Sequence, residues 1–294
     1  MIPREILKKV QRIHIRTKHM VSDVFAGEYH SVFKGRGMEF QEVREYVPGD
    51  EIRTIDWNVT ARMGHPYVKK FTEERELTVM LLVDISASHS FGSTPQLKKD
   101  LAAEIAAVLA FSAIQNNDRV GLVLFTDEIE RYIPPRKGVS HVLRVIRDVL
   151  YFQPKHKGTR IEPVLDFLNH VTTRKTVTFM ISDFASPEDL RRPLAVTSKR
   201  HDLIGVVVGD KRELAWPAAG LVDWLDAETG RRYLVDTADA ATRRAFGTLQ
   251  AQRREQLREL FQTCAMDRIE VNAGEPYERE FVKFFKLRER RFRT

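Results

Sequence analysis

Leu77–Ser88 reads LTVMLLVDISAS and decides the fold of this chain. The run is short and rich in Val and Leu, which predicts a strand that is buried on both faces, as in parallel sheets. It ends at Asp84, Ser86 and Ser88, an Asp-x-Ser-x-Ser arrangement. Because ligands of open parallel sheets bind beyond the carboxyl ends of the strands, these oxygen donors indicate a site for a hard cation such as Mg²⁺ or Mn²⁺.

Two later positions extend this candidate site. Thr176–Ser182 is a second apolar run, and it stops at Asp183. Lys157-Gly158-Thr159 precedes a pattern with helical spacing, so the Thr159 hydroxyl lies in a loop that enters a helix. Capping of strand-to-helix turns would explain any one of these residues without a metal. Their order after successive elements favours a metal site made of Asp84, Ser86, Ser88, Thr159 and Asp183.

Strands and helices alternate downstream of Leu77. Apolar stripes predict helices at 96–114, 140–150, 188–199 and 241–261 and a last helix that starts at Pro276. Strands are predicted at 119–125, 129–133, 203–208 and 268–271, with a hairpin at 221–235. The link between the first two of these strands is so short that they must be antiparallel. The sequence thus predicts an α/β fold with a mostly parallel sheet, one antiparallel edge strand, helices on both faces and a central first strand.

The segment upstream of this pattern has a different composition. Residues 27–71 are dense in Gly, Arg, Asp and aromatic residues and show no clean periodicity. We therefore divide the chain into a basic N-terminal helix (1–26), a Gly/Arg/Asp-rich irregular module that contains β structure (27–75), and an α/β domain with a C-terminal helix (76–294). We expect the module to lie against the sheet or its edge. Trp57 within it is interpreted as a core side chain, with an anchor for a partner as the alternative.

The candidate ligands and the upstream module both resemble known families. The five ligands are similar to the metal-ion-dependent adhesion site of von Willebrand factor A domains. The runs GRGMEFQEVREYVPGDEIRTIDWNVTAR and YVKKFTEERELTVMLLVDISAS resemble proteins of the domain-of-unknown-function 58 family, which carry a von Willebrand A-like domain. The resemblance extends from about Gly27 to about Asp183 by motif, and further by element order. It implies a von Willebrand A-like fold and an adaptor role beside a MoxR-type AAA+ ATPase, in assembly, metal insertion or remodelling of client complexes.

Composition and charge limit the function classes. The net charge of +7 is concentrated at the two ends of the chain, which indicates a solvated or partner-facing basic surface more than a nucleic-acid site. No window reaches the roughly 18 continuous apolar residues of a membrane span, although many members of the resembled family carry such helices. Because the N-terminus lacks the apolar core of a secretion signal and Cys264 is the lone cysteine, we expect a cytoplasmic protein.

The motifs favour binding over catalysis. The sequence contains no phosphate-binding loop, no G-x-S-x-G and no H-E-x-x-H, so it predicts a protein that is not an enzyme. Three hydroxyls and two carboxylates would neutralise a divalent cation and leave a coordination position for an acidic residue of a partner. We therefore expect a metal-dependent protein–protein interaction module that works with a MoxR-type ATPase and an acidic client. The alternative is a cytosolic divalent-metal-dependent hydrolase, a phosphoesterase or nuclease, that uses the same aspartates.

Overall fold

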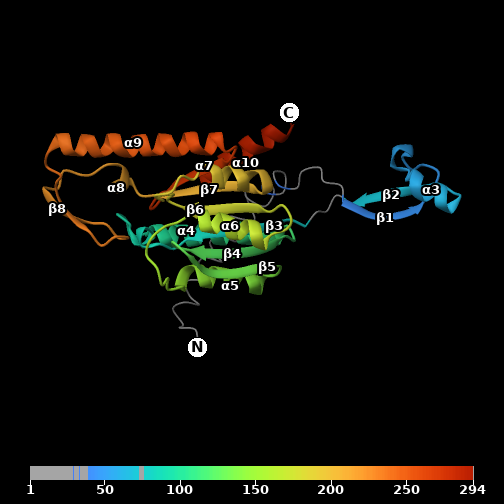
Figure 1. Ribbon diagram of the computed structural model, residues 1–294, viewed down its shortest axis with the longest axis horizontal. Helices are drawn as coiled ribbons and strands as arrows, with labels where there is room; N and C mark the ends of the chain where they lie inside the picture. The colour runs from blue at the N-terminus through green and yellow to red at the C-terminus, as the bar shows by residue number, and fades with distance from the viewer. Residues whose placement is uncertain (1–28, 30–32, 34–38, 73–75, 294) are drawn as a thin grey trace.

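A six-stranded sheet forms the centre of the molecule (Figure 1). The computed structural model describes Tyr29, Phe33 and residues 39–72 and 76–293. The strand order is β10-β7-β6-β3-β4-β5. β5 runs antiparallel to β4 at one edge, and the other pairs are parallel. The strands are β3 (Thr78–Asp84), β4 (Arg119–Phe125), β5 (Ile129–Arg136), β6 (Val177–Ser182), β7 (Asp202–Gly209) and β10 (Asp267–Asn272). The expected mostly parallel sheet, with one antiparallel edge strand and its first strand inside the sheet, is confirmed.

Strand β3 is buried on both faces, as its apolar run predicts. Side chains of a strand alternate between the two faces of a sheet. Val79, Leu81 and Val83 accordingly belong to one core cluster, whereas Met80 and Leu82 belong to the other. All of these side chains are fully buried. The two cores fix β3 from both sides and so fix the place where its carboxyl end delivers Asp84.

Helices cover both faces of the sheet. One core contains residues of α4 (Lys98–Gln115), α5 (Val139–Tyr151) and α10 (Glu278–Arg293). The other contains residues of α6 (Glu162–Val171), α7 (Arg191–Arg200) and the C-terminal part of α9 (Ala240–Thr263). Helix α7 begins later than the predicted residue 188. The Glu188 carboxylate instead accepts hydrogen bonds from the backbone N–H groups of Ile161 and Glu162, at the start of α6.

Helix α9 extends beyond the sheet and packs on a second hairpin (Figure 1). This hairpin consists of β8 (Leu221–Leu225) and β9 (Arg232–Asp236) and follows the short helix α8 (Lys211–Leu214). The Trp216 ring stacks on Phe246 of α9 with ring centroids 3.9 Å apart. Leu249 of the same helix is 47% exposed, so the apolar stripe that predicts the helix at 241–261 does not face a core along its whole length. The reason is that this part of α9 covers the small hairpin rather than the wide sheet.

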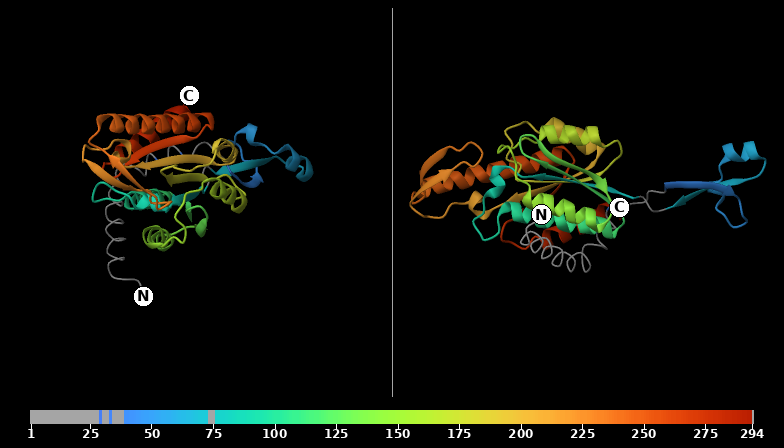
Figure 2. Two further views of the ribbon diagram at one scale, coloured as in Figure 1. Left: turned by 60° about the vertical axis from the view of Figure 1, so that its left-hand side comes forward. Right: turned by 90° about the horizontal axis from the view of Figure 1, so that it is seen from below.

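The upstream module forms a separate small unit between residues 39 and 72. It contains β1 (Glu39–Glu45), the 3₁₀ turn η2 (Ile52–Thr54), α3 (Trp57–Met63) and β2 (Tyr67–Thr72). β1 and β2 pair with each other, so their backbone groups are satisfied without the central sheet. Figures 1 and 2 show the module projecting away from that sheet, and the expectation that it lies against the sheet is wrong.

Trp57 opens α3 and is 68% exposed, so its interpretation as a core side chain is also wrong. The carboxylate of Asp56 caps this helix by accepting from the backbone N–H groups of Asn58 and Val59, which fixes the helix without burial of the Trp57 ring. The predicted N-terminal helix at 1–26 lies outside the described residues. Within the described residues, no helix has both the length and the apolar character needed to cross a membrane.

Candidate metal centre

Three of the predicted ligands lie at or just after the carboxyl end of β3 and meet the fourth directly after β6. The Asp84 Oδ1 atom accepts from the Ser86 backbone N–H at 2.9 Å, which turns the chain sharply after the strand. Ser88 lies in the following 3₁₀ turn, η3 (Ala87–Ser90). Its Oγ atom is 3.1 Å from the Ser86 Oγ atom and donates to Oδ2 of Asp183 at 2.8 Å. The structure therefore brings Asp84, Ser86, Ser88 and Asp183 into one hydrogen-bonded set.

Thr159, the fifth predicted ligand, lies in the loop between α5 and α6, and only 2% of its surface is exposed. The Lys157 carbonyl accepts from the Ala87 backbone N–H at 3.0 Å, which ties this loop to η3. The Thr159 hydroxyl donates to the Glu228 Oε1 atom at 2.7 Å. Glu228 comes from the turn between β8 and β9 and is not among the ligands that the sequence predicts.

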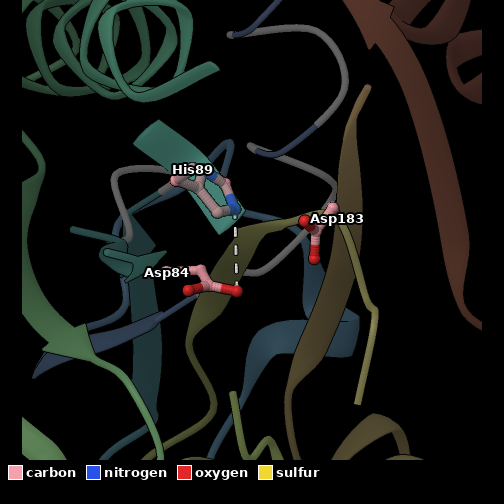
Figure 3. Close-up of side chains that lie close together, drawn as sticks. All are labelled: Asp84, His89 and Asp183. Atoms are coloured by element: carbon pink, nitrogen blue, oxygen red, sulfur yellow. Dashed lines mark ion pairs between the residues drawn. The ribbon is translucent and has the colours of Figure 1, made fainter. Parts of the chain in front are cut away.

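His89 also reaches the site without having been predicted. Its side chain is 1% exposed, and its Nε2 atom lies 3.6 Å from Oδ2 of Asp84 (Figure 3). Ligand atoms of Asp84, His89 and Asp183 all lie within 4.8 Å of one another. Across the described part of the chain, neither ring nitrogen of His89 finds a hydrogen-bond partner. A buried imidazole without hydrogen-bond partners beside two carboxylates is an arrangement that a metal ion would complete.

Lys98 is the third unpredicted residue of the site. Its amine is fully buried at the start of α4 and lies 2.9 Å from Oδ2 of Asp183 and 2.6 Å from Oε1 of Glu213. Glu213 belongs to α8. A sequence signal for Lys98 did exist, because it precedes Leu101 by three residues and Ile105 by seven and so shares their buried helix face. Glu213 and Glu228 lie in short polar segments where local sequence carries no such signal.

The electrostatics of the site are dominated by buried carboxylates. Burial raises the pKa of Asp84 above its ordinary value. Burial also acts to raise the pKa of Asp183, but the nearby His89 and Lys98 outweigh it and hold this pKa at about 2. The pKa values of Glu213 and Glu228 are raised by burial, with a further contribution from the charge of Asp183. Asp183 and Glu213 therefore flank the Lys98 amine, whereas Asp84 and Glu228 interact with the charge of Asp183 from elsewhere in the site.

This donor set fits a divalent cation. A hydroxyl that donates its hydrogen to a carboxylate keeps its lone pairs for a metal, and Ser88 and Thr159 are both arranged in this way. The Asp84 and Asp183 carboxylates would supply the charge. The imidazole of His89 would favour Mn²⁺ over Mg²⁺, because nitrogen ligands suit transition metals better than magnesium.

Several known proteins are similar to this chain in sequence. A family profile described as "Protein of unknown function DUF58" matches residues 42–256. An uncharacterized protein of Mycobacterium tuberculosis is 30% identical over 285 residues, which cover 96% of this chain and 89% of that protein. An uncharacterized protein of Bacillus subtilis is 27% identical over 105 residues, which cover 36% of this chain and 24% of that protein.

A solved structure shares the fold. An aerotolerance-related membrane protein from Bacteroides fragilis superposes with a TM-score of 0.50 at 16% identity, over 73% of this chain and 99% of that chain. At this level of identity the likeness concerns the arrangement of strands and helices.

Proposed function

The chain belongs to the DUF58 family, and we propose that it is a protein–protein interaction module whose binding depends on a divalent cation. The observation that carries this proposal is the hydrogen-bonded set of Asp84, Ser86, Ser88 and Asp183 at the carboxyl ends of β3 and β6. Ligands of open α/β sheets bind at this edge. The set combines hydroxyl and carboxylate oxygens, which are the donors that Mg²⁺ and Mn²⁺ take in proteins.

In this proposal each side chain has a defined task. Asp84, Ser86, Ser88, Thr159 and Asp183 hold the cation, and His89 is positioned to add a nitrogen ligand. Lys98 keeps Asp183 charged and oriented by its buried ion pair. When bound, the cation supplies a positive charge to which a carboxylate of the partner can bind. The partner is therefore expected to present an exposed Asp or Glu on a surface that fits the sheet edge.

We further propose that the module works in the cytoplasm with a MoxR-type AAA+ ATPase on a client complex. The support is the family membership, together with the adaptor role that the resemblance implies. The β1–β2 module leads into the amino-terminal end of β3, whereas Asp84 lies at the carboxyl end of the same strand. Two partners could thus bind at opposite ends of the sheet without a clash, as an adaptor requires.

Calorimetric titration of the full chain with Mn²⁺ and Mg²⁺ tests the proposal. We expect saturable binding by the wild type and its loss in Asp84→Asn, because that change removes a buried anionic ligand. Asp223→Asn is the matched control, since Asp223 is an exposed aspartate of β8 that pairs with Arg232. Equal heats of binding for the wild type and Asp84→Asn would refute the proposed metal centre and the function that depends on it.

A further inference from the structure

The turn between β8 and β9 reaches the candidate metal centre from a distant part of the sequence. Glu228 lies at the tip of this hairpin, 69 positions beyond Thr159, to which it is hydrogen-bonded at 2.7 Å. Thr159 itself is almost completely buried. Glu228 is partly buried, whereas its neighbours Ala227 and Thr229 are exposed. The glutamate side chain therefore extends from the tip toward Thr159.

The conformation of the tip is fixed by its own hydrogen bonds. The Asp226 Oδ1 atom accepts from the backbone N–H groups of Glu228 at 3.0 Å and Thr229 at 3.2 Å. Gly230 closes the turn with φ of 72°, a conformation that suits glycine, and its N–H donates to the Asp226 carbonyl at 2.8 Å. An aspartate that holds the following backbone in this way makes a defined turn. The position of Glu228 is thus built into the hairpin.

The base of the hairpin is held independently of the metal centre. The Thr237 hydroxyl donates to the Gly220 carbonyl at 2.7 Å and accepts from the Ala219 backbone N–H at 3.0 Å. Trp224 of β8 packs against Trp216 with ring centroids 5.2 Å apart. Loss of the contact between Glu228 and Thr159 would therefore release the tip without unfolding the hairpin.

We propose that Glu228 is a built-in carboxylate ligand of the metal centre and that it occupies the position which an acidic residue of a partner must take. The Glu228 Oε1 atom accepts one hydrogen bond from Thr159, so the second oxygen and the remaining lone pairs are free for a cation. Beside the five predicted oxygen ligands, the six-fold coordination that Mg²⁺ and Mn²⁺ prefer leaves one position, for which Glu228, a carboxylate of a partner and the His89 imidazole would compete. A partner then binds by displacing the hairpin tip, which makes β8–β9 an autoinhibitory element.

This inference rests on the proposed metal-dependent function and adds its regulation. In the free chain, Glu228 would shield the cation from solvent. Only a carboxylate of a partner that makes further contacts with the chain would replace Glu228. An intramolecular ligand has a high effective concentration, so free acidic residues of other proteins would compete poorly. The hairpin thus gives the site selectivity for one partner surface.

Titration of the full-length chain with Mn²⁺ tests the inference. The variant is Glu228→Gln, which keeps the size of the side chain and removes its charge. Glu255→Gln is the matched control, because Glu255 is an exposed glutamate of α9. We expect wild type and Glu255→Gln to bind Mn²⁺ equally and Glu228→Gln to bind at least about tenfold more weakly, as changes in the surroundings of a metal commonly do. Water-proton relaxation should report more exchangeable water on the Mn²⁺ ion of Glu228→Gln.

The outcomes distinguish a failure of Glu228 as a ligand from a failure of the metal centre. If Glu228→Gln binds Mn²⁺ as tightly as wild type with unchanged relaxation, Glu228 is not a ligand, while the metal centre stands. If wild type binds no Mn²⁺, the metal centre and the role of Glu228 both fall. Thermal melting of both variants checks the fold, and Glu228→Ala provides a second test of the same position if the amide itself binds the ion.

Discussion

The Nζ atom of Lys98 lies 2.9 Å from Oδ2 of Asp183, so a fully buried amine holds a carboxylate that the sequence assigns to a metal ion. The same oxygen also accepts from the Ser88 hydroxyl at 2.8 Å. Asp183 therefore joins two groups of charges, the candidate ligands on one side and the pair of Lys98 and Glu213 on the other. The amine keeps Asp183 ionised in a buried place, which a metal ligand requires.

Replacement of Lys98 by Met is expected to lower the free energy of unfolding by about 3–5 kcal/mol at neutral pH, because it leaves buried carboxylates without their partner. Urea denaturation measures the change. Lys99→Met is the matched control, since Lys99 is the exposed neighbour of Lys98 on α4. Adding Glu213→Gln to Lys98→Met should restore part of the loss by removing one of the two stranded charges. A Lys98→Met chain as stable as wild type would refute the structural role of this ion pair.

Most of the fold was predictable because its signals are local. The apolar run of β3 and the short link between β4 and β5 each determine a pairing by length and pattern alone. The exposed Trp57 and Leu249 were not predictable in this way. Their burial depends on whether the module and the first half of α9 pack on the central sheet, and periodicity within one element does not contain that information.

The candidate site likewise contains some residues that local sequence patterns locate and others that only the tertiary structure brings into place. Strand ends locate Asp84 and Asp183, and short polar motifs beside them locate Ser86, Ser88 and Thr159. His89 and Lys98 follow nearby in the chain but reach the site through the geometry of η3 and α4. Glu228 arrives from a hairpin that is distant in sequence, and only the tertiary structure brings it to Thr159. Contacts over such separations are invisible to pattern analysis of one chain.

His89 is expected to tune the choice of metal. Its two unpartnered ring nitrogens lie beside Asp84 and Asp183, so His89→Leu should weaken Mn²⁺ binding more than Mg²⁺ binding. We expect the ratio of the two affinities to fall on the order of tenfold, measured by competition calorimetry. His65→Leu, in the exposed part of the upstream module, should leave the ratio unchanged. An equal ratio in His89→Leu and wild type would mean that the imidazole does not bind the ion.

Trp57 is expected to serve binding rather than stability. Val47, Ile52 and Met63 of the same module are also more than half exposed, so the module leaves several apolar side chains in solvent. Trp57→Ala should change the free energy of unfolding by no more than about 0.5 kcal/mol, as surface substitutions do. If the proposed MoxR-type ATPase binds this module, Trp57→Ala should weaken its capture in a pull-down. Trp216→Ala is the contrast, because that ring stacks on Phe246 and its loss should lower the melting temperature. A large loss of stability in Trp57→Ala would contradict the exposed position.

A buried histidine far from the metal centre provides a pH-dependent prediction. His201 is fully buried at the end of α7, and its Nδ1 atom lies 3.0 Å from the Thr176 hydroxyl and 3.3 Å from the Thr176 backbone nitrogen. Burial is the main cause that lowers its pKa from 6.5 to about 4, with further contributions from the charges of Arg200 and Lys175. The imidazole is therefore neutral in the folded protein under conditions where it is protonated in the unfolded chain.

The sign of the resulting effect follows from proton binding. Between pH 6.5 and 4 the unfolded chain binds the proton and the folded protein does not, so acidification favours unfolding throughout this window. The contribution of His201 between pH 7 and pH 5 is about 2 kcal/mol of lost stability, from the relation between pKa shifts and free energy. His201→Gln cannot take up the proton, so its loss of stability over the same interval should be smaller by that amount. Urea denaturation of both proteins at pH 7 and pH 5 provides the comparison, and the difference between the two pH values cancels any constant cost of the substitution. Identical pH dependence in wild type and His201→Gln would show that the imidazole takes up its proton as readily in the folded protein as in the unfolded chain.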